Sequence, residues 1–193
     1  MSLPGILAEE EVIKTCTQYL KRTNTGAKKR GIGIVWAAAP QDEYEAERRR
    51  ITRSLPCEAV KKLLKYWPEN TDQLIALQLG IELQWASKNS KIMIPKSPTD
   101  WEDTAHLVEG MEAIITVDTA MAHLAGALGI PTILLLNRPC DWRWGQMSDT
   151  REPLYTNMKI LRCEQFNRWD SILHQLPEEV RKLKRSRDHL SKP

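Results

Sequence analysis

Short apolar runs alternate with polar or amphipathic segments along most of the chain. The clearest case spans residues 114–136, where an apolar run ends in Asp118, a helix-prone segment follows at once, and a Gly-Ile-Pro turn leads into a second apolar run. Strands buried on both faces of a parallel sheet are apolar throughout, and a crossover helix joins consecutive ones. The segment therefore predicts a strand, a helix and a second, parallel strand.

The same alternation predicts elements on either side of this segment. Further apolar runs predict strands at residues 31–39, 73–79, 91–94 and 159–162. Helical spacing of apolar residues, with proline and glycine at the boundaries, predicts helices at residues 8–20, 56–66, 100–110 and 169–184. Strands that alternate with helices of this length predict an α/β fold with a doubly wound parallel sheet.

Length and composition bound the domain organisation. With 193 residues, 41% of them hydrophobic, the chain is long enough to bury one good core. We therefore predict a single domain over residues 1–193, built from four consecutive parts. These are a lead-in helix and linker at 8–30, an α/β core at 31–165, a closing helix at 166–185 and a basic tail at 186–193.

Charge and cysteine content exclude several classes of protein. The net charge of +3 is too small to require an acidic partner. The basic C-terminus could contact nucleic acid or anionic lipid, but the solubilising, frayed end that is typical of chain termini is the favoured interpretation. The four cysteines form no C-x-x-C pair, the N-terminus lacks a signal-peptide pattern, and no apolar run approaches the ~20 residues of a membrane span. We expect a cytoplasmic protein without a membrane span.

Asp118 is the first candidate for a ligand contact. It lies where a strand ends and a helix begins, and the amides of a first helical turn lack intrahelical partners, so such a corner attracts anions. An aspartate there can hold a ribose while the amides hold phosphate. The alternative is that Asp118 only caps the helix, which aspartate does well. By contrast, Gly31-Ile-Gly33 lacks a third glycine and precedes its strand, which excludes a dinucleotide-binding loop.

Two motifs resemble a known enzyme family. Residues 117–129, Val-Asp-Thr-Ala-Met-Ala-His-Leu-Ala-Gly-Ala-Leu-Gly, followed by Asp-Trp-Arg-Trp at 141–144, resemble the nucleotide-binding domain of a group of glycosyltransferases. The chain looks like the C-terminal domain of heptosyltransferase-like enzymes and of tetratricopeptide-repeat glycosyltransferases related to O-GlcNAc transferase. Shorter matches, such as Arg53-Ser-Leu-Pro56 and Leu77-Gln-Leu-Gly80, fall in the family's order. The likeness covers roughly residues 8–184.

The resemblance implies one half of a GT-B architecture, in which two Rossmann-like domains face each other across a cleft. It implies a nucleotide-sugar donor as substrate, no cofactor and no metal, because amides and cations neutralise the leaving diphosphate. The lack of an Asp-x-Asp pair in the sequence agrees with this. The implied donor-binding residues are Asp118, Thr119, Ala120 and His123, with Gln78, Arg143 and Trp144 as weaker candidates. The family's acceptor-side catalytic base has no counterpart in this sequence, so the catalytic residue is unknown.

Two of these candidates have an alternative interpretation as structural residues. His123 can donate to phosphate or sugar, or it can be a helix histidine that is hydrogen-bonded inside the domain. The tryptophans of residues 141–144 can stack on a base, or they can close the rim of the core.

The chain departs from the family pattern in three places. An acceptor-binding half would precede residue 1, Leu79 stands where the family commonly has lysine, and Ala38-Ala-Pro-Gln41 replaces a Gly-x-Pro loop that a histidine follows. The arginines at 48–50 either supply positive charge instead or form a solvated cluster.

Three hypotheses of function remain open. The first is a domain that binds a nucleotide-diphosphate sugar and acts as a metal-independent GT-B glycosyltransferase only when an N-terminal acceptor domain completes it. The second is a non-catalytic α/β binding or scaffold module derived from such an enzyme. The third is a nucleic-acid-associated protein that uses the basic tail. Besides the separate acceptor domain, a second copy of the chain is an expected partner, through an apolar stripe on the lead-in helix formed by Val12, Ile13, Cys16 and Leu20.

Overall fold

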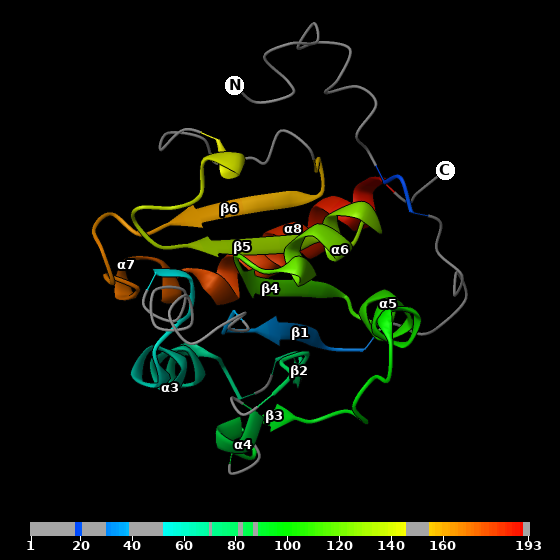
Figure 1. Cartoon of the computed structure of the whole chain (residues 1–193), viewed down its shortest axis with the longest axis horizontal. Helices are drawn as coiled ribbons and strands as arrows, with labels where there is room; N and C mark the ends of the chain where they lie inside the picture. The colour runs from blue at the N-terminus through cyan, green and yellow to red at the C-terminus, as the bar shows by residue number, and fades with distance from the viewer. Residues whose placement is uncertain are drawn as a thin grey trace, which may run out of the picture.

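A six-stranded parallel sheet forms the centre of the fold (Figure 1). The computed structural model describes residues 18–20, 30–38, 52–69, 71–80, 83–86, 89–145 and 155–190. Most of the predicted lead-in helix, the arginines at 48–50 and the last three residues of the tail lie outside this part of the chain.

The strands run parallel in the order β3-β2-β1-β4-β5-β6. They are β1 (Ile32–Val35), β2 (Leu74–Ala76), β3 (Ile92–Met93), β4 (Ala113–Val117), β5 (Thr132–Leu136) and β6 (Met158–Arg162). Each of the predicted apolar runs contains or overlaps one of these strands. The predicted doubly wound, Rossmann-like sheet is therefore confirmed, and its strand order is that of a dinucleotide-binding fold.

Helices connect the strands and cover the sheet. They are α3 (Cys57–Tyr66), α4 (Leu83–Ala86), α5 (Trp101–Glu109), α6 (Ala120–Ala127), α7 (Asp170–Leu173), α8 (Leu176–Leu190) and the 3₁₀ turn η2 (Trp142–Trp144). The helices predicted at 56–66 and 100–110 correspond to α3 and α5. At the start of α5, Asp100 accepts a hydrogen bond from the backbone N–H of Asp103 at 2.8 Å, which is a normal N-terminal cap.

The two faces of the sheet bury alternate residues of each strand. Ile133 and Leu135 of β5 belong to a core that includes α3, α7 and α8, whereas Leu134 and Leu136 pack on the other face with residues of α6 and β6. A second cluster on that face joins α5 and α6 to β1 and β4. Because helices cover both faces, the strands are apolar throughout, as the sequence pattern indicated.

The predicted closing helix is divided in two. α7 ends before residues 174–175, and α8 begins with Leu176 and Pro177. Proline lacks an N–H and is favoured in the first turn of a helix, so its position explains the new start. α8 then extends to Leu190, into the stretch predicted as tail.

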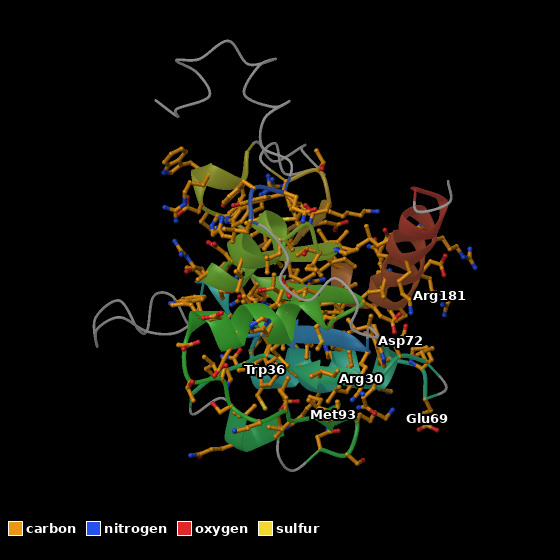
Figure 2. The ribbon with its side chains drawn as sticks, turned by 90° about the vertical axis from the view of Figure 1, so that its right-hand side faces the viewer. Arg30, Trp36, Glu69, Asp72, Met93 and Arg181 are labelled. Atoms are coloured by element: carbon orange, nitrogen blue, oxygen red, sulfur yellow. The ribbon has the colours of Figure 1, made fainter. Side chains whose placement is uncertain are left out.

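A lysine of α8 lies between two carboxylates at the amino-terminal edge of the sheet, where the strands begin. The Nζ of Lys184 lies 2.8 Å from Oδ1 of Asp72 and also contacts Glu112. Asp72 precedes β2, and Figure 2 shows it on the same side of the molecule as Arg181 of α8.

Residues 18–20 are the described part of the lead-in segment, and they are not helical. Leu20 donates its backbone N–H to the carbonyl of Ala127, at 3.1 Å, which places this segment against the end of α6. Leu20 is 40% exposed. The other three residues of the predicted apolar stripe lie outside the described residues, so dimerisation through this helix stays a prediction.

Within the described residues, no helix is both long enough and apolar enough to cross a membrane.

Gly33 in β1 is required by its neighbours. A Cβ atom at this position would lie 2.5 Å from Cδ1 of Leu77 and 2.6 Å from Cδ1 of Ile114. Glycine therefore serves close packing here, which agrees with the exclusion of a dinucleotide-binding loop from the sequence.

Replacement of Gly33 by alanine is expected to lower the free energy of unfolding by about 1–3 kcal/mol, because an added methyl group overfills a packed core. Urea denaturation measures this difference. Gly110→Ala is the matched control, because Gly110 has φ −73° and an added Cβ would meet nothing closer than 3.4 Å. Equal stability of the two variants would contradict this account of Gly33.

Candidate functional site

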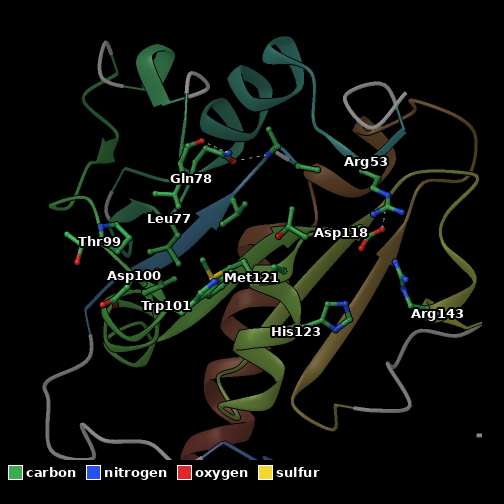
Figure 3. Close-up of a pocket in the computed structure, with 18 residues that line it drawn as sticks. Arg53, Leu77, Gln78, Thr99, Asp100, Trp101, Asp118, Met121, His123 and Arg143 are labelled. Carbon is green, nitrogen blue, oxygen red and sulfur yellow. Dashed lines mark hydrogen bonds and ion pairs between the residues drawn. The ribbon is translucent and has the colours of Figure 1, made fainter. Parts of the chain in front are cut away.

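A cavity of about 670 Å³ lies at the carboxyl edge of the sheet, where the strand order reverses between β1 and β4 (Figure 3). Its walls come from the segments that follow β1, β2 and β4, from the first residues of α5 and α6, and from η2. The chain leaves β1 toward α3 on one face and β4 toward α6 on the other, so a crevice opens between them. Ligands of open α/β sheets bind at such a switch point.

Four charged side chains form a network at one wall of the cavity. Nε of Arg53 forms an ion pair with Oδ2 of Asp118 at 3.2 Å, and Nη2 of Arg53 donates a hydrogen bond to Oδ2 of Asp141 at 3.1 Å. Arg143 donates to the same Oδ2 of Asp141 at 3.0 Å. The Asp118 side chain is only 7% exposed, so the guanidinium of Arg53 compensates a carboxylate that is nearly removed from water.

Arg53 reaches the cavity because the residues after it are tied to the end of β1. The hydroxyl of Ser54 accepts a hydrogen bond from the N–H of Ala38 at 3.0 Å, and the N–H of Leu55 donates to the carbonyl of Trp36 at 2.8 Å. Arg53 is not among the site residues predicted from the sequence. The Arg-Ser-Leu-Pro motif that it begins was the available signal.

The first turn of α6 faces the cavity without a side-chain cap from its N-cap residue. The N-cap residue is Thr119 and not Asp118. The hydroxyl of Thr119 makes no capping hydrogen bond; it lies 3.2 Å from the hydroxyl of Thr116 and pairs with that hydroxyl instead. Asp118 is instead engaged with Arg53. Thr119, Ala120 and Met121 line the cavity, so this helix start has the features of an anion site.

His123 lies one turn into α6 and also lines the cavity. Its Nδ1 is 3.1 Å from the hydroxyl of Tyr155, and its ring stacks on Trp144 with centroids 4.8 Å apart and planes 18° apart. Burial lowers the pKa of His123 below its ordinary value; Arg143 acts in the same direction, and the carboxylates of Asp118 and Asp141 oppose it. The imidazole is thus neutral at neutral pH.

Trp144 and Gln78 support the cavity rather than present polar groups to it. Trp144 is 1% exposed and stacks on His123, so its position agrees with the alternative that it closes the rim of the core. Gln78 lines the cavity, but its Oε1 accepts from the N–H groups of Trp36 and Ala37 at 3.1 and 2.9 Å, and its Nε2 donates to the carbonyl of Leu79. Gln78 therefore joins the ends of β1 and β2.

Apolar side chains occupy the side of the cavity away from the charged network. Leu79, which stands where the resemblance implies lysine, lines the cavity and is 50% exposed. Trp101, the first residue of α5, also lines it and is 65% exposed. The cavity thus combines a charged wall with an apolar one. Among the described residues, no group of three or more His, Cys, Asp or Glu side chains is arranged to hold a metal ion.

The fold resembles solved glycosyltransferase structures. The E. coli heptosyltransferase WaaC with ADP is 16% identical, with a TM-score of 0.57, over 82% of this chain and 45% of that one. The E. coli ADP-heptose lps heptosyltransferase II is 18% identical, with a TM-score of 0.62, over 94% of this chain and 53% of that one. WaaC with ADP-2-deoxy-2-fluoro heptose is 17% identical, with a TM-score of 0.53, over 85% of this chain and 44% of that one.

The chain therefore spans about half the length of these solved structures. A search of curated proteins gave no significant match. The family model of glycosyltransferase family 9 (heptosyltransferase) matches residues 67–165, which is just over half of the chain and includes β2 to β6 with α6 between β4 and β5. The sequence match and the shared fold together assign this chain to glycosyltransferase family 9, the heptosyltransferases.

Proposed function

We propose that the cavity binds the nucleotide-diphosphate sugar donor of a glycosyltransferase, with Asp118 and Arg53 at its centre. The observation that carries this proposal is the ion pair between these two residues beside the uncapped start of α6. It joins, in one place, a carboxylate for ribose hydroxyls, a guanidinium for phosphate oxygens and backbone amides for the remaining negative charge.

The ribose, the diphosphate and the base of such a nucleotide sugar each have complementary groups in the cavity. Asp118 accepts hydrogen bonds from the ribose, and the amides of Thr119 and Ala120 donate to the diphosphate. Arg53 retains donors for the same phosphates, because a guanidinium carries five N–H groups and the contacts to Asp118 and Asp141 use only Nε and Nη2. His123 adds a donor one turn farther along α6. The apolar wall with Trp101 and Leu79 suits the face of a base.

The sugar would be transferred by direct displacement at its anomeric carbon. The bond from that carbon to the donor's phosphate oxygen breaks as the acceptor's hydroxyl oxygen attacks, and the diphosphate leaves with the electron pair. Arg53, Arg143 and the helix amides would stabilise the charge that develops on the leaving group, so no metal is needed. The acceptor hydroxyl and the base that takes its proton would come from a separate acceptor domain. A closer relation of this chain to the glycosyltransferases related to O-GlcNAc transferase is part of the same proposal.

A second candidate function has an observation in its favour. Both cavity arginines are already paired with carboxylates, and Leu79 supplies no charge, so the described cavity has less free positive charge than the family pattern provides. This favours a module that binds a nucleotide without transferring sugar.

The proposal predicts that a nucleoside diphosphate stabilises the chain. We expect one of ADP, UDP, GDP and CDP, at 100 times its dissociation constant, to add about 2.7 kcal/mol, which raises Tm by about 5–10 °C in a protein of this size. Asp118→Asn is expected to remove most of this shift, because the neutral amide keeps the shape of aspartate but loses its charge. Differential scanning fluorimetry measures both.

Asp72→Asn is the matched control for this experiment, because Asp72 precedes β2 at the opposite edge of the sheet. Its nucleotide-induced shift should equal that of the unmodified chain. The absence of a shift with all four nucleotides, or equal loss in both variants, would contradict the proposal. Transfer of a sugar after addition of an acceptor domain separates the enzyme from the non-catalytic module.

Replacement of Arg53 by glutamine is expected to weaken ADP binding about 10–100-fold and to affect adenosine binding much less, because the diphosphate is the part of the ligand that the guanidinium would contact. Isothermal titration calorimetry is preferred to a melting shift, since the loss of Arg53 also leaves the buried Asp118 without its partner. Arg181→Gln, on α8, is the control. A similar loss for adenosine and ADP would overturn this role of Arg53.

A further inference from the structure

His123 is held from two sides by aromatic residues that do not line the cavity. Trp144 stacks under its ring, and the ring of Tyr155 meets it edge-on, with centroids 5.9 Å apart and planes 62° apart. The hydroxyl of Tyr155 lies 3.1 Å from Nδ1 of His123. The plane of the imidazole and one of its two nitrogens are therefore fixed before any ligand enters.

A glycine makes room for Tyr155. Gly126 lies three residues after His123 on α6, and a Cβ atom there would be 2.5 Å from both Cγ and Cδ1 of the Tyr155 ring. Glycine is, after proline, the poorest helix former, so its place inside α6 needs a reason. Close approach of the tyrosine ring to the helix that carries His123 supplies that reason.

The hydrogen bond to Tyr155 leaves one polar atom of the imidazole for the cavity. Nε2 of His123 has no partner among the described residues, and His123 lines the cavity. A neutral imidazole carries a single N–H, and a phosphate oxygen without a proton can only accept. If Tyr155 donates to Nδ1, that N–H must be at Nε2.

A second tyrosine favours this direction of donation. The hydroxyl of Tyr19 lies 3.4 Å from the hydroxyl of Tyr155, and the two rings stack with centroids 6.5 Å apart. Tyr19 is the more exposed of the two tyrosines, at 60% against 4% for Tyr155. When Tyr19 donates to Tyr155, the hydroxyl proton of Tyr155 can point to Nδ1 of His123, and both of these hydrogen bonds then run toward the cavity.

We propose that Tyr155 is a positioning residue that selects the Nε2–H tautomer of His123 and so gives the cavity a fixed N–H donor for an anionic ligand oxygen. Gly126 is the second part of this device, because it lets the tyrosine ring reach the helix. The selection of the tautomer is a property of the chain without ligand. Only the identity of the ligand rests on the proposed function.

Burial favours the neutral form of the imidazole that this device requires, against the carboxylates that surround it. Asp118 faces it from the end of β4, Asp141 and Arg143 from the η2 segment, and Tyr155 from the residues before β6. Burial, the largest influence on its pKa, lowers that pKa. The two nitrogens can therefore be distinguished at neutral pH.

The test is long-range ¹H–¹⁵N correlation spectroscopy of the full chain labelled in histidine, recorded without nucleotide. We expect His123 to be protonated at Nε2, with an Nδ1 resonance displaced by the hydrogen bond that it accepts. His123→Gln assigns the signals. In Tyr155→Phe, which removes one oxygen and keeps the ring, Nδ1 should move to the value of a free acceptor. Tyr66→Phe, on α3, is the matched control and should leave it unchanged.

Two further variants sharpen the result. Gly126→Ala should change the Nδ1 resonance in the same direction as Tyr155→Phe, although it leaves the hydroxyl in the chain. Both variants should weaken the binding of the stabilising nucleoside diphosphate about twofold to tenfold, the usual effect of losing one hydrogen bond. A general loss of stability would not single out one nitrogen of one histidine.

The failure of this inference and the failure of the proposed function have different signatures. Protonation of His123 at Nδ1, or an Nδ1 resonance that Tyr155→Phe leaves in place, would overturn the positioning role even if the chain binds a nucleotide. Expected spectra in a chain that binds none of the nucleotides would uphold the positioning role and reject the proposed function.

Discussion

The carboxyl edge of the parallel sheet is the constraint on which the site depends. α5 and α6 cover one face, and α3, α7 and α8 cover the other, so both faces are apolar and ionised side chains gather where the strands end. The strand order places β1 beside β4, and the segments that follow these two strands lead to opposite faces of the sheet. Asp118 lies in this opening because it directly follows β4. Arg53 lies there because hydrogen bonds join the two residues after it to the end of β1.

The ion pair of Asp118 and Arg53 gives this edge its chemistry. A carboxylate that is 7% exposed is stable only with a compensating charge, and Arg53 provides it while a second contact to Asp141 fixes the orientation of the guanidinium. The same planar group suits phosphate oxygens, so one residue serves both the folded state and the proposed ligand. The chain belongs to glycosyltransferase family 9, and the proposed nucleotide-sugar donor would contact both members of this ion pair.

The sequence predicted the elements whose pattern is local, and it missed what depends on tertiary contacts. The apolar runs on both sides of Asp118 correctly located β4, α6 and β5. Parallel strands that are buried on both faces are apolar at every position, so they stand out from the polar segments around them. The division between α7 and α8 was missed, although Pro177 marks it. Periodicity alone did not reveal that a proline near the middle of a helical pattern begins a new helix.

In the candidate site, too, the sequence predicted residues that a local pattern marks and missed those that only tertiary contacts bring to the cavity. Asp118 and the start of α6 were found because a strand end and a helix start are visible in sequence. Arg53 was passed over among neighbouring arginines, because only the hydrogen bonds of Ser54 and Leu55 bring it to the cavity. The roles of Tyr155 and Gly126 could not be predicted, since these two residues are in contact but lie 29 positions apart in the chain.

Binding of a nucleoside diphosphate at the carboxyl edge between β1 and β4 is the central part of our proposal. Backbone ¹H–¹⁵N spectra of the full chain during titration with ADP test it most directly, because each amide reports its own position. We expect the largest shift changes at the amides of Thr119, Ala120 and Met121 and at the side-chain N–H of Arg53. Changes confined to α8 and the opposite edge of the sheet, or none at millimolar ADP, would contradict it.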